Sequence, residues 1–172
     1  TPGCRHVQRG EFAMLDEFFG LPLHPLVVHL TVVLVPTTAV VAIVFAVVEQ
    51  WRWALRWLLG AMVLGSLAST GLSLLAGEAF LASRPELAPL VAEHQAAGKT
   101  LLWFVVMFTV ATLVAVATLG GPSPMVSGAG GRRGVPKGAR VGIGSLLVVM
   151  ALLCLYQVIR TGDLGARAVW GG

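Results

Sequence analysis

The sequence predicts an all-α integral membrane protein that folds as an antiparallel bundle of four transmembrane helices, and three observations support this fold class. The 172 residues are 56% hydrophobic and only 12% charged, whereas about 25% of the residues in a typical soluble domain are charged. Four stretches without Asp, Glu, Lys or Arg are long enough to cross a hydrocarbon core of about 30 Å, which takes roughly 20 helical residues. Their apolar residues are continuous rather than alternating, which favours helices over a membrane β-barrel.

The predicted domain organisation is a leader at residues 1–20, which we expect to be mobile, followed by one transmembrane domain at residues 21–170. The leader lacks a long apolar core followed by a small-residue cleavage site, so we expect no signal peptide and assign the leader no function. A segment rich in Gly, Pro, Ser and basic residues is expected to be a flexible loop at 120–140. The four helices are expected at about 24–48, 57–77, 97–119 and 141–160.

The first predicted helix begins near His24, because Pro25 suits a first helical turn, where its missing N–H would have no partner. Pro36 lies farther in and predicts a kink unless Thr37 or Thr38 helps to satisfy the freed carbonyl. The segment after this helix has the tryptophans and arginines typical of a membrane–water boundary, namely Trp51, Arg52, Trp53, Arg56 and Trp57. Its short turn makes the first two helices antiparallel.

The second predicted helix has a small residue at every fourth position: Ala61, Gly65, Ser69, Ser73 and Gly77. Such a row lets another helix backbone approach closely, so it favours helix packing. The alternative is that the bare face accommodates a flat cofactor ring.

The connection at residues 78–99 is long enough for a short surface helix, which Pro85 and Pro89 interrupt. His94 follows these prolines and precedes the third helix, so antiparallel packing places it at the same membrane face as His24. The end of the fourth helix and the tail after it return to this face.

Charge favours an orientation with both termini outside. Lys and Arg number six on each side of the predicted membrane, but four against six when Arg5 and Arg9 of the leader are set aside. Since positively charged loops stay in the cytoplasm, the loops near residues 49–56 and 120–140 are expected there. The expected location is the bacterial inner membrane, with the histidine face on its outer side.

Several function classes find no support. The two cysteines, Cys4 and Cys154, form neither a disulfide framework nor a Cys-x-x-Cys-His motif, which excludes covalent c-type haem attachment. The net charge of +4 is not gathered in a basic stripe, so no nucleic-acid partner is expected. Without a P-loop or a Gly-x-Ser-x-Gly motif, the chain is expected to be an electron carrier or accessory subunit rather than a stand-alone enzyme.

Histidines and other polar residues converge on the outer face of the predicted bundle, namely His24, His29, His94, Gln157, Thr161 and Asp163. Ionisable side chains within membrane helices are rare and usually face the bundle interior, where they have partners. A single histidine is as well explained by a hydrogen bond to a backbone carbonyl or to Gln157. Three histidines on one face favour a ligand site.

Haem b is the preferred cofactor. His24 and His29 lie about 140° apart around a regular helix, so they do not form a metal-binding i, i+4 pair. Histidines on two different helices can instead ligate opposite faces of a haem, and His29 and His94 are the predicted axial pair. His24 would then orient a propionate at the rim beside Gln157, while Arg160 or Arg167 offsets propionate charge. The alternative assigns His24, His29 and His94 together to zinc or copper.

The run from Gly20 to Leu30, with its His-Pro-Leu-Val-Val-His segment, resembles a bacterial family of predicted small membrane proteins, domain of unknown function 2231. The histidine before the third helix and the Gly-Asp-Leu-Gly-Ala tail also match, so the resemblance covers most of residues 20–170. Many relatives have Phe-Pro after the second histidine, whereas this chain has Leu30 and Thr31 and places its proline at Pro36. Some relatives are joined to Rieske-type iron–sulfur domains, so the resemblance implies a redox setting.

The expected function is therefore that of a membrane haem b-binding electron-transfer protein with bis-histidine ligation, working in a lipid bilayer with a redox partner or within a larger membrane complex. A homo-oligomer is compatible with the sequence. Two alternatives remain open: a non-catalytic scaffold or accessory subunit held by the small-residue face of the second helix, and a histidine-based metal-binding membrane protein.

Overall fold

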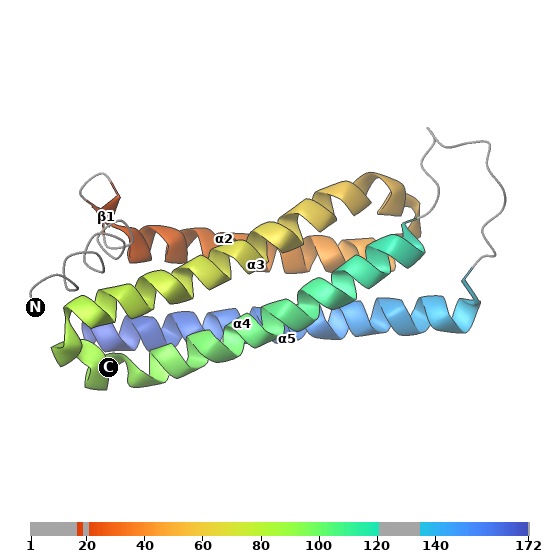
Figure 1. The fold of residues 1–172 in the computed structure, drawn as a ribbon. Coiled ribbons are helices and arrows are strands. Elements are labelled where there is room, and N and C mark those ends of the chain that lie inside the picture. The colour runs from red at the N-terminus through yellow and green to blue at the C-terminus, as the bar shows by residue number, and fades with distance from the viewer. Residues whose placement is uncertain (1–16, 19–20, 121–134, 172) are drawn as a thin grey trace, which may run out of the picture.

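A computed structural model describes residues 17–18, 21–120 and 135–171 (Figure 1). Two short antiparallel strands, β1 (Glu17–Phe18) and β2 (Leu21–Pro22), precede the helices. The long helices are α2 (Leu23–Val47), α3 (Arg52–Ser83), α4 (Ala88–Leu119) and α5 (Lys137–Trp170). Single 3-10 turns, η1 (Glu49–Trp51) and η2 (Pro85–Leu87), join α2 to α3 and α3 to α4.

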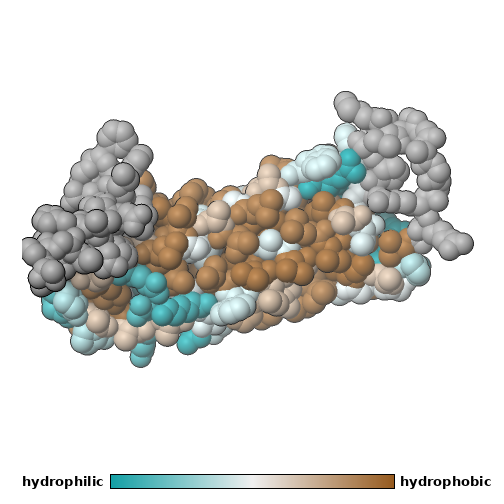
Figure 2. Space-filling view, viewed as in Figure 1, coloured by the Kyte–Doolittle hydropathy of each residue, from teal (hydrophilic) through white to brown (hydrophobic). Residues whose placement is uncertain are grey.

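The structure confirms the predicted all-α membrane fold class. In the described part of the chain, four helices are long and apolar enough to cross a membrane. Large apolar side chains such as Val33, Leu64, Val110 and Ile159 point away from the bundle, as lipid-facing residues do. On the face that Figure 2 shows, a hydrophobic band covers the middle of the bundle and hydrophilic residues gather toward its ends.

Successive helices alternate in direction (Figure 1). Thr31 of α2 contacts Ser73 of α3, whereas the later Thr38 contacts the earlier Ser66, so these helices run in opposite senses. The start of α2, the end of α3, the start of α4 and the end of α5 therefore share one end, which we call the histidine end. Helix α2 packs on α3 and α5, and α4 packs on the same two helices, which makes α2 and α4 diagonal neighbours.

Three helices run farther than the apolar stretches predicted. Helix α3 continues to Ser83, α4 begins at Ala88, and α5 spans Lys137–Trp170. A charge ends an apolar stretch but does not end a helix, because the backbone hydrogen bonds form within the helix and do not depend on whether a side chain is charged. No separate surface helix therefore forms between α3 and α4. Most of the leader and most of the loop expected at 120–140 lie outside the described residues.

Charged residues mark where the hydrocarbon ends on the histidine side. Lys99 of α4 pairs with Glu78 of α3 at 3.5 Å. The helical rise from Trp57 to Glu78 is about 31 Å at 1.5 Å per residue, which matches a hydrocarbon core of about 30 Å. Three helix ends thus project beyond the membrane core, and His94 lies about 7 Å outside the level of Lys99.

The small-residue row of α3 packs against α2. A Cβ on Gly65 would lie 3.2 Å from Cδ2 of Leu34, and the Ser73 hydroxyl lies 2.9 Å from that of Thr31. Close helix packing, the first of the two interpretations of this row, therefore accounts for Gly65 and Ser73. Ala61, at the start of the row, is exposed.

Pro36 is accommodated within a continuous α2. The hydroxyls of Thr37 and Thr38 donate to the carbonyls of Val33 and Leu34, each at 2.7 Å. Pro36 frees the carbonyl of Val32, four residues earlier, so these two hydrogen bonds do not satisfy the carbonyl for which the threonines were expected to compensate.

Candidate histidine site

His94 binds the backbone of the neighbouring helix. Its Nδ1 atom lies 2.9 Å from the carbonyl oxygen of Thr161, which joins α4 to α5. A carbonyl oxygen can only accept a hydrogen bond, so Nδ1 bears the proton and donates. In the neutral imidazole, Nε2 then keeps a lone pair.

Gly165 lets the His94 ring lie directly against α5. A Cβ at this position would lie 2.9 Å from Cε1 and 3.0 Å from Nδ1 of His94, distances that real Cβ atoms hardly ever show. Any larger residue at position 165 would displace the ring. The absence of a side chain is thus part of the geometry that holds His94.

Gln157 and Thr161 are buried on the inner side of the same contact, only 2% and 8% exposed. The Gln157 side-chain amide donates to the carbonyl of Ala97 at 3.4 Å. The Thr161 hydroxyl donates to the carbonyl of Gln157 at 2.8 Å. The outer end of the α4–α5 contact is therefore polar. Gln157 and Thr161 lie on the side of α5 that faces α4, where His94 meets them.

The structure places His29 apart from this cluster. His29 lies on α2, which is diagonal to α4, and its side chain is exposed. Both residues belong to the histidine end. His24 is the second residue of α2, and its side chain lies outside the described part of the structure.

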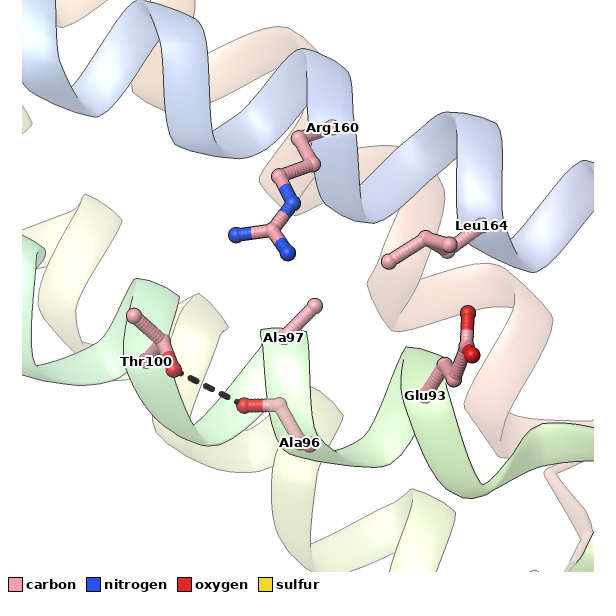
Figure 3. A pocket seen from close by; sticks show the side chains of 6 residues that line it. All are labelled: Glu93, Ala96, Ala97, Thr100, Arg160 and Leu164. Carbon is pink, nitrogen blue, oxygen red and sulfur yellow. Dashed lines mark hydrogen bonds between the residues drawn. The ribbon is translucent and has the colours of Figure 1, made fainter.

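The two arginines predicted beside the site differ in their surroundings. Arg167 is exposed and pairs with Asp163 one turn earlier, at 2.9 Å. Arg160 lines a pocket of about 340 Å³ on the outer side of the α4–α5 contact, together with Glu93 (Figure 3). The structure therefore brings together His94, Gln157 and Thr161, with Arg160 one residue along the helix from Thr161.

Among the described side chains, no group of three or more His, Cys, Asp or Glu residues lies close enough to hold a metal ion. The zinc or copper alternative also needs His24, whose side chain lies outside the described part of the structure. His29 and His94 do not form such a group with the described acidic residues.

Sequence reasoning identified His94, Gln157 and Thr161 but missed Gly165 and the role of the Thr161 carbonyl. A backbone acceptor leaves no trace in residue type. The glycine offered a signal, because a glycine within a helix costs about 0.5–1 kcal/mol relative to alanine and calls for a packing reason. The second glycine nearby, Gly162, has nothing within 4 Å of its would-be Cβ, so composition alone could not separate the two.

Comparison with known protein families identifies the family of this chain. A family model described as "Predicted membrane protein (DUF2231)" matches residues 20–172. No curated protein and no solved structure matches the chain.

Proposed function

This chain belongs to the DUF2231 family of predicted membrane proteins, and from that premise we propose that it transfers electrons through one b-type haem ligated by His94 and His29. The haem, when bound, supplies one-electron redox chemistry. The protein's part is to supply ligands, to orient them and to set their surroundings.

The observation that supports this function most is the hydrogen bond between His94 and Thr161. Histidines that ligate metals usually donate their second ring N–H to a carbonyl or carboxylate, which fixes the tautomer and raises the basicity of the ligating nitrogen. The Nδ1 contact at 2.9 Å gives His94 this arrangement. Its donor chemistry therefore fits an iron ligand at Nε2.

The surroundings of His94 fit the same role. Gly165 limits the rotation of the ring, and Gln157 and Thr161 provide buried polar groups next to it. We assign the second ligand to His29, the other described histidine at this end of the bundle, on the helix diagonal to α4; its side chain is exposed, so it would have to turn toward the bundle interior to share a haem with His94. Ligands on diagonal helices can address two faces of one planar group in a bundle.

The level of His94 adds to the proposal. A ligand about 7 Å outside the hydrocarbon boundary lies near the membrane surface, where a water-soluble redox partner or a neighbouring subunit of a membrane complex has access. We place this end on the outer face of a bacterial inner membrane, because the arginine-rich turn near Arg52 and the basic segment at 132–140 then lie in the cytoplasm.

Absorption spectra test the proposal. The purified protein, supplemented with haem, should show a Soret band that shifts on reduction with dithionite, with the sharp visible bands of a low-spin bis-histidine haem. His94→Ala and His29→Ala should each convert this spectrum to a high-spin one or abolish haem retention. His6→Ala is the matched control, since His6 belongs to the leader, and should leave the spectrum unchanged.

Two results would contradict the proposal. One is the absence of a Soret band after supplementation of folded protein, with folding checked by helical circular dichroism. The other is an unchanged low-spin spectrum in the His94→Ala variant.

A further inference from the structure

Arg160 and Glu93 face the same pocket from opposite helices. Arg160 extends from α5 toward α4, and Glu93 extends from α4 toward Leu164 of α5 (Figure 3). In the described part of the chain, neither has a hydrogen-bond or ion-pair partner. The pocket thus offers an unengaged cation and an unengaged anion, separated from each other.

The pocket lies at the membrane boundary. Of its lining residues on α4, Thr100 lies nearest the middle of the membrane. Thr100 directly follows Lys99, which with Glu78 marks the end of the apolar span. Its volume of about 340 Å³ is near the lower end of the roughly 300–1,000 Å³ typical of small-ligand pockets. The site therefore suits a headgroup rather than a whole lipid.

A second, apolar pocket of about 270 Å³ lies between the same two helices farther inside the membrane, and it shares no lining residue with the first. Most of the α4 residues of both pockets fall on one stripe at intervals of three or four residues, which is one face of a helix. The stripe consists of Glu93, Ala96 and Thr100 from the first pocket and Met107, Val110 and Val114 from the second, with the exposed Trp103, which lines neither pocket, between them. A polar pocket at the boundary and an apolar one below it match the two parts of a phospholipid.

The order of charges along the membrane normal specifies the headgroup. Arg160 lies about one helical turn, or about 6 Å, closer to the hydrocarbon than Leu164, and Leu164 is the residue that Glu93 approaches (Figure 3). From the membrane outward the ligand would meet an apolar groove, a guanidinium and then a carboxylate. A phospholipid with a primary ammonium group presents an acyl chain, a phosphate and an ammonium in that same order.

We propose that the α4–α5 groove binds phosphatidylethanolamine, with Arg160 on the phosphate, Glu93 on the ammonium and Met107, Val110 and Leu146 along an acyl chain. Guanidinium and phosphate form charge-assisted, bidentate hydrogen bonds. The primary ammonium has N–H donors for Glu93, whereas the quaternary ammonium of phosphatidylcholine has none. Phosphatidylglycerol has no cation for Glu93 at all.

This inference is independent of the haem proposal. It gives Arg160 a lipid phosphate in place of a haem propionate, and it uses the outer side of the α4–α5 contact while His94 lies on the inner side. The lipid experiment is done on protein without haem, so the two proposals can fail separately.

Native mass spectrometry of the full chain tests the inference, with equimolar phosphatidylethanolamine, phosphatidylcholine and phosphatidylglycerol of identical acyl chains added in detergent. The wild type should retain phosphatidylethanolamine severalfold better than either competitor. Arg160→Gln should lower this retention about tenfold, the loss expected from removing one charged hydrogen-bonding group. Glu93→Gln should remove the preference over phosphatidylcholine.

Arg167→Gln is the matched control, because Arg167 lies on the same helix outside the pocket, and it should retain lipid as the wild type does. Equal retention of the three lipids by the wild type would overturn the proposal, as would wild-type retention in Arg160→Gln. Free phosphoethanolamine tests whether the headgroup alone accounts for binding. If it displaced the lipid at equal concentration, the acyl groove would contribute nothing to binding, and the proposal would also be overturned.

Discussion

The backbone of Gly165 lies so close to His94 that a Cβ on residue 165 would stand 2.9 Å from Cε1 of the histidine ring. The ring is held between this glycine and the carbonyl of Thr161. Packing on one side and a hydrogen bond on the other thus fix one imidazole at the end of the α4–α5 pair.

Gly165→Ala should therefore displace the ring and weaken its hydrogen bond. Alanine in a helix gains about 0.5–1 kcal/mol over glycine, but loss of this hydrogen bond costs about 0.5–1.5 kcal/mol. Gly162→Ala is the matched control, since nothing lies within 4 Å of its would-be Cβ, and it should show the gain alone.

Reversible unfolding in detergent, followed by helical circular dichroism, measures the difference. The free energy of unfolding should be about 1 kcal/mol lower for Gly165→Ala than for Gly162→Ala, because both variants gain a helical alanine and only Gly165→Ala loses the hydrogen bond. Equal stabilisation by the two alanines would show that the His94 ring can move aside with no loss of folding free energy. Gly165 would then not position the ring.

The membrane boundary near Lys99 gives a second prediction. In a Cys4→Ser background, Gln95→Cys should react with a membrane-impermeant maleimide, because residue 95 lies about 6 Å outside the level of Lys99. Val110→Cys should not react, since its exposed side chain lies within the apolar span. Cys154 is fully buried in the bundle and should contribute no background.

The same reaction tests the orientation. Intact spheroplasts expose only the outer face of the inner membrane, so Gln95→Cys should be labelled in them if the histidine end faces outward. Labelling only after the membrane is broken would reverse the proposed orientation.

Sequence patterns predicted the number and type of helices well, because the cost of unpaired backbone groups in lipid leaves a long apolar segment little choice but a helix. They also placed His94 at the right end of the bundle. They underestimated helix length, since the charged residues that end a lipid-facing stretch, such as Glu78 and Lys99, do not interrupt backbone hydrogen bonding.

The sequence could not show which side of a helix each histidine faces relative to its neighbours. His29 and His94 looked equivalent as ionisable residues near an apolar segment. Their difference arises from packing: α4 lies against α5, where Gly165 and the carbonyl of Thr161 receive the ring, whereas the His29 side chain is exposed on α2. Rotation of a helix about its own axis depends on all its contacts together, so no local motif specifies it.

A third prediction concerns the buried hydroxyl pair between α2 and α3. The oxygens of Thr38 and Ser66 lie 2.9 Å apart and both residues are fully buried. Hydrogen bonds between membrane helices contribute about 0.6 kcal/mol on average and at most about 1.7 kcal/mol. A double-mutant cycle of Thr38→Val and Ser66→Ala should yield a coupling energy in this range.

Thr37→Val is the control for that cycle, because the exposed Thr37 hydroxyl bonds only the carbonyl of Val33 in its own helix. Combined with Ser66→Ala, it should give strictly additive changes in the free energy of unfolding. A coupling energy of zero for Thr38 and Ser66 would mean that this hydroxyl pair contributes nothing to the packing of α2 on α3.

The fourth prediction concerns Arg52, which closes the opposite end of the bundle. Its Nε and Nη2 atoms donate to the carbonyls of Phe45 and Ala46 at 3.0 and 2.7 Å, near the C-terminus of α2, where helix carbonyls lack amide donors. Glu49 lies 3.5 Å from Arg52 and 2.7 Å from Arg140 of α5. Arg52 therefore satisfies two carbonyls of α2 and, through Glu49, links the α2–α3 turn to α5.

Arg52→Gln should lower the free energy of unfolding by about 2–3 kcal/mol, since hydrogen bonds to charged groups contribute about 1.5–3 kcal/mol and the carbonyls would remain buried. Arg52→Lys should recover only part of this loss, because an ammonium lacks the planar fork that reaches two acceptors. Arg140→Gln, which removes only the exposed contact to Glu49, should cost less than about 1 kcal/mol. If Arg140→Gln proved as costly as Arg52→Gln, the ion pair with Glu49, and not the carbonyl contacts, would be what stabilises this end of the bundle.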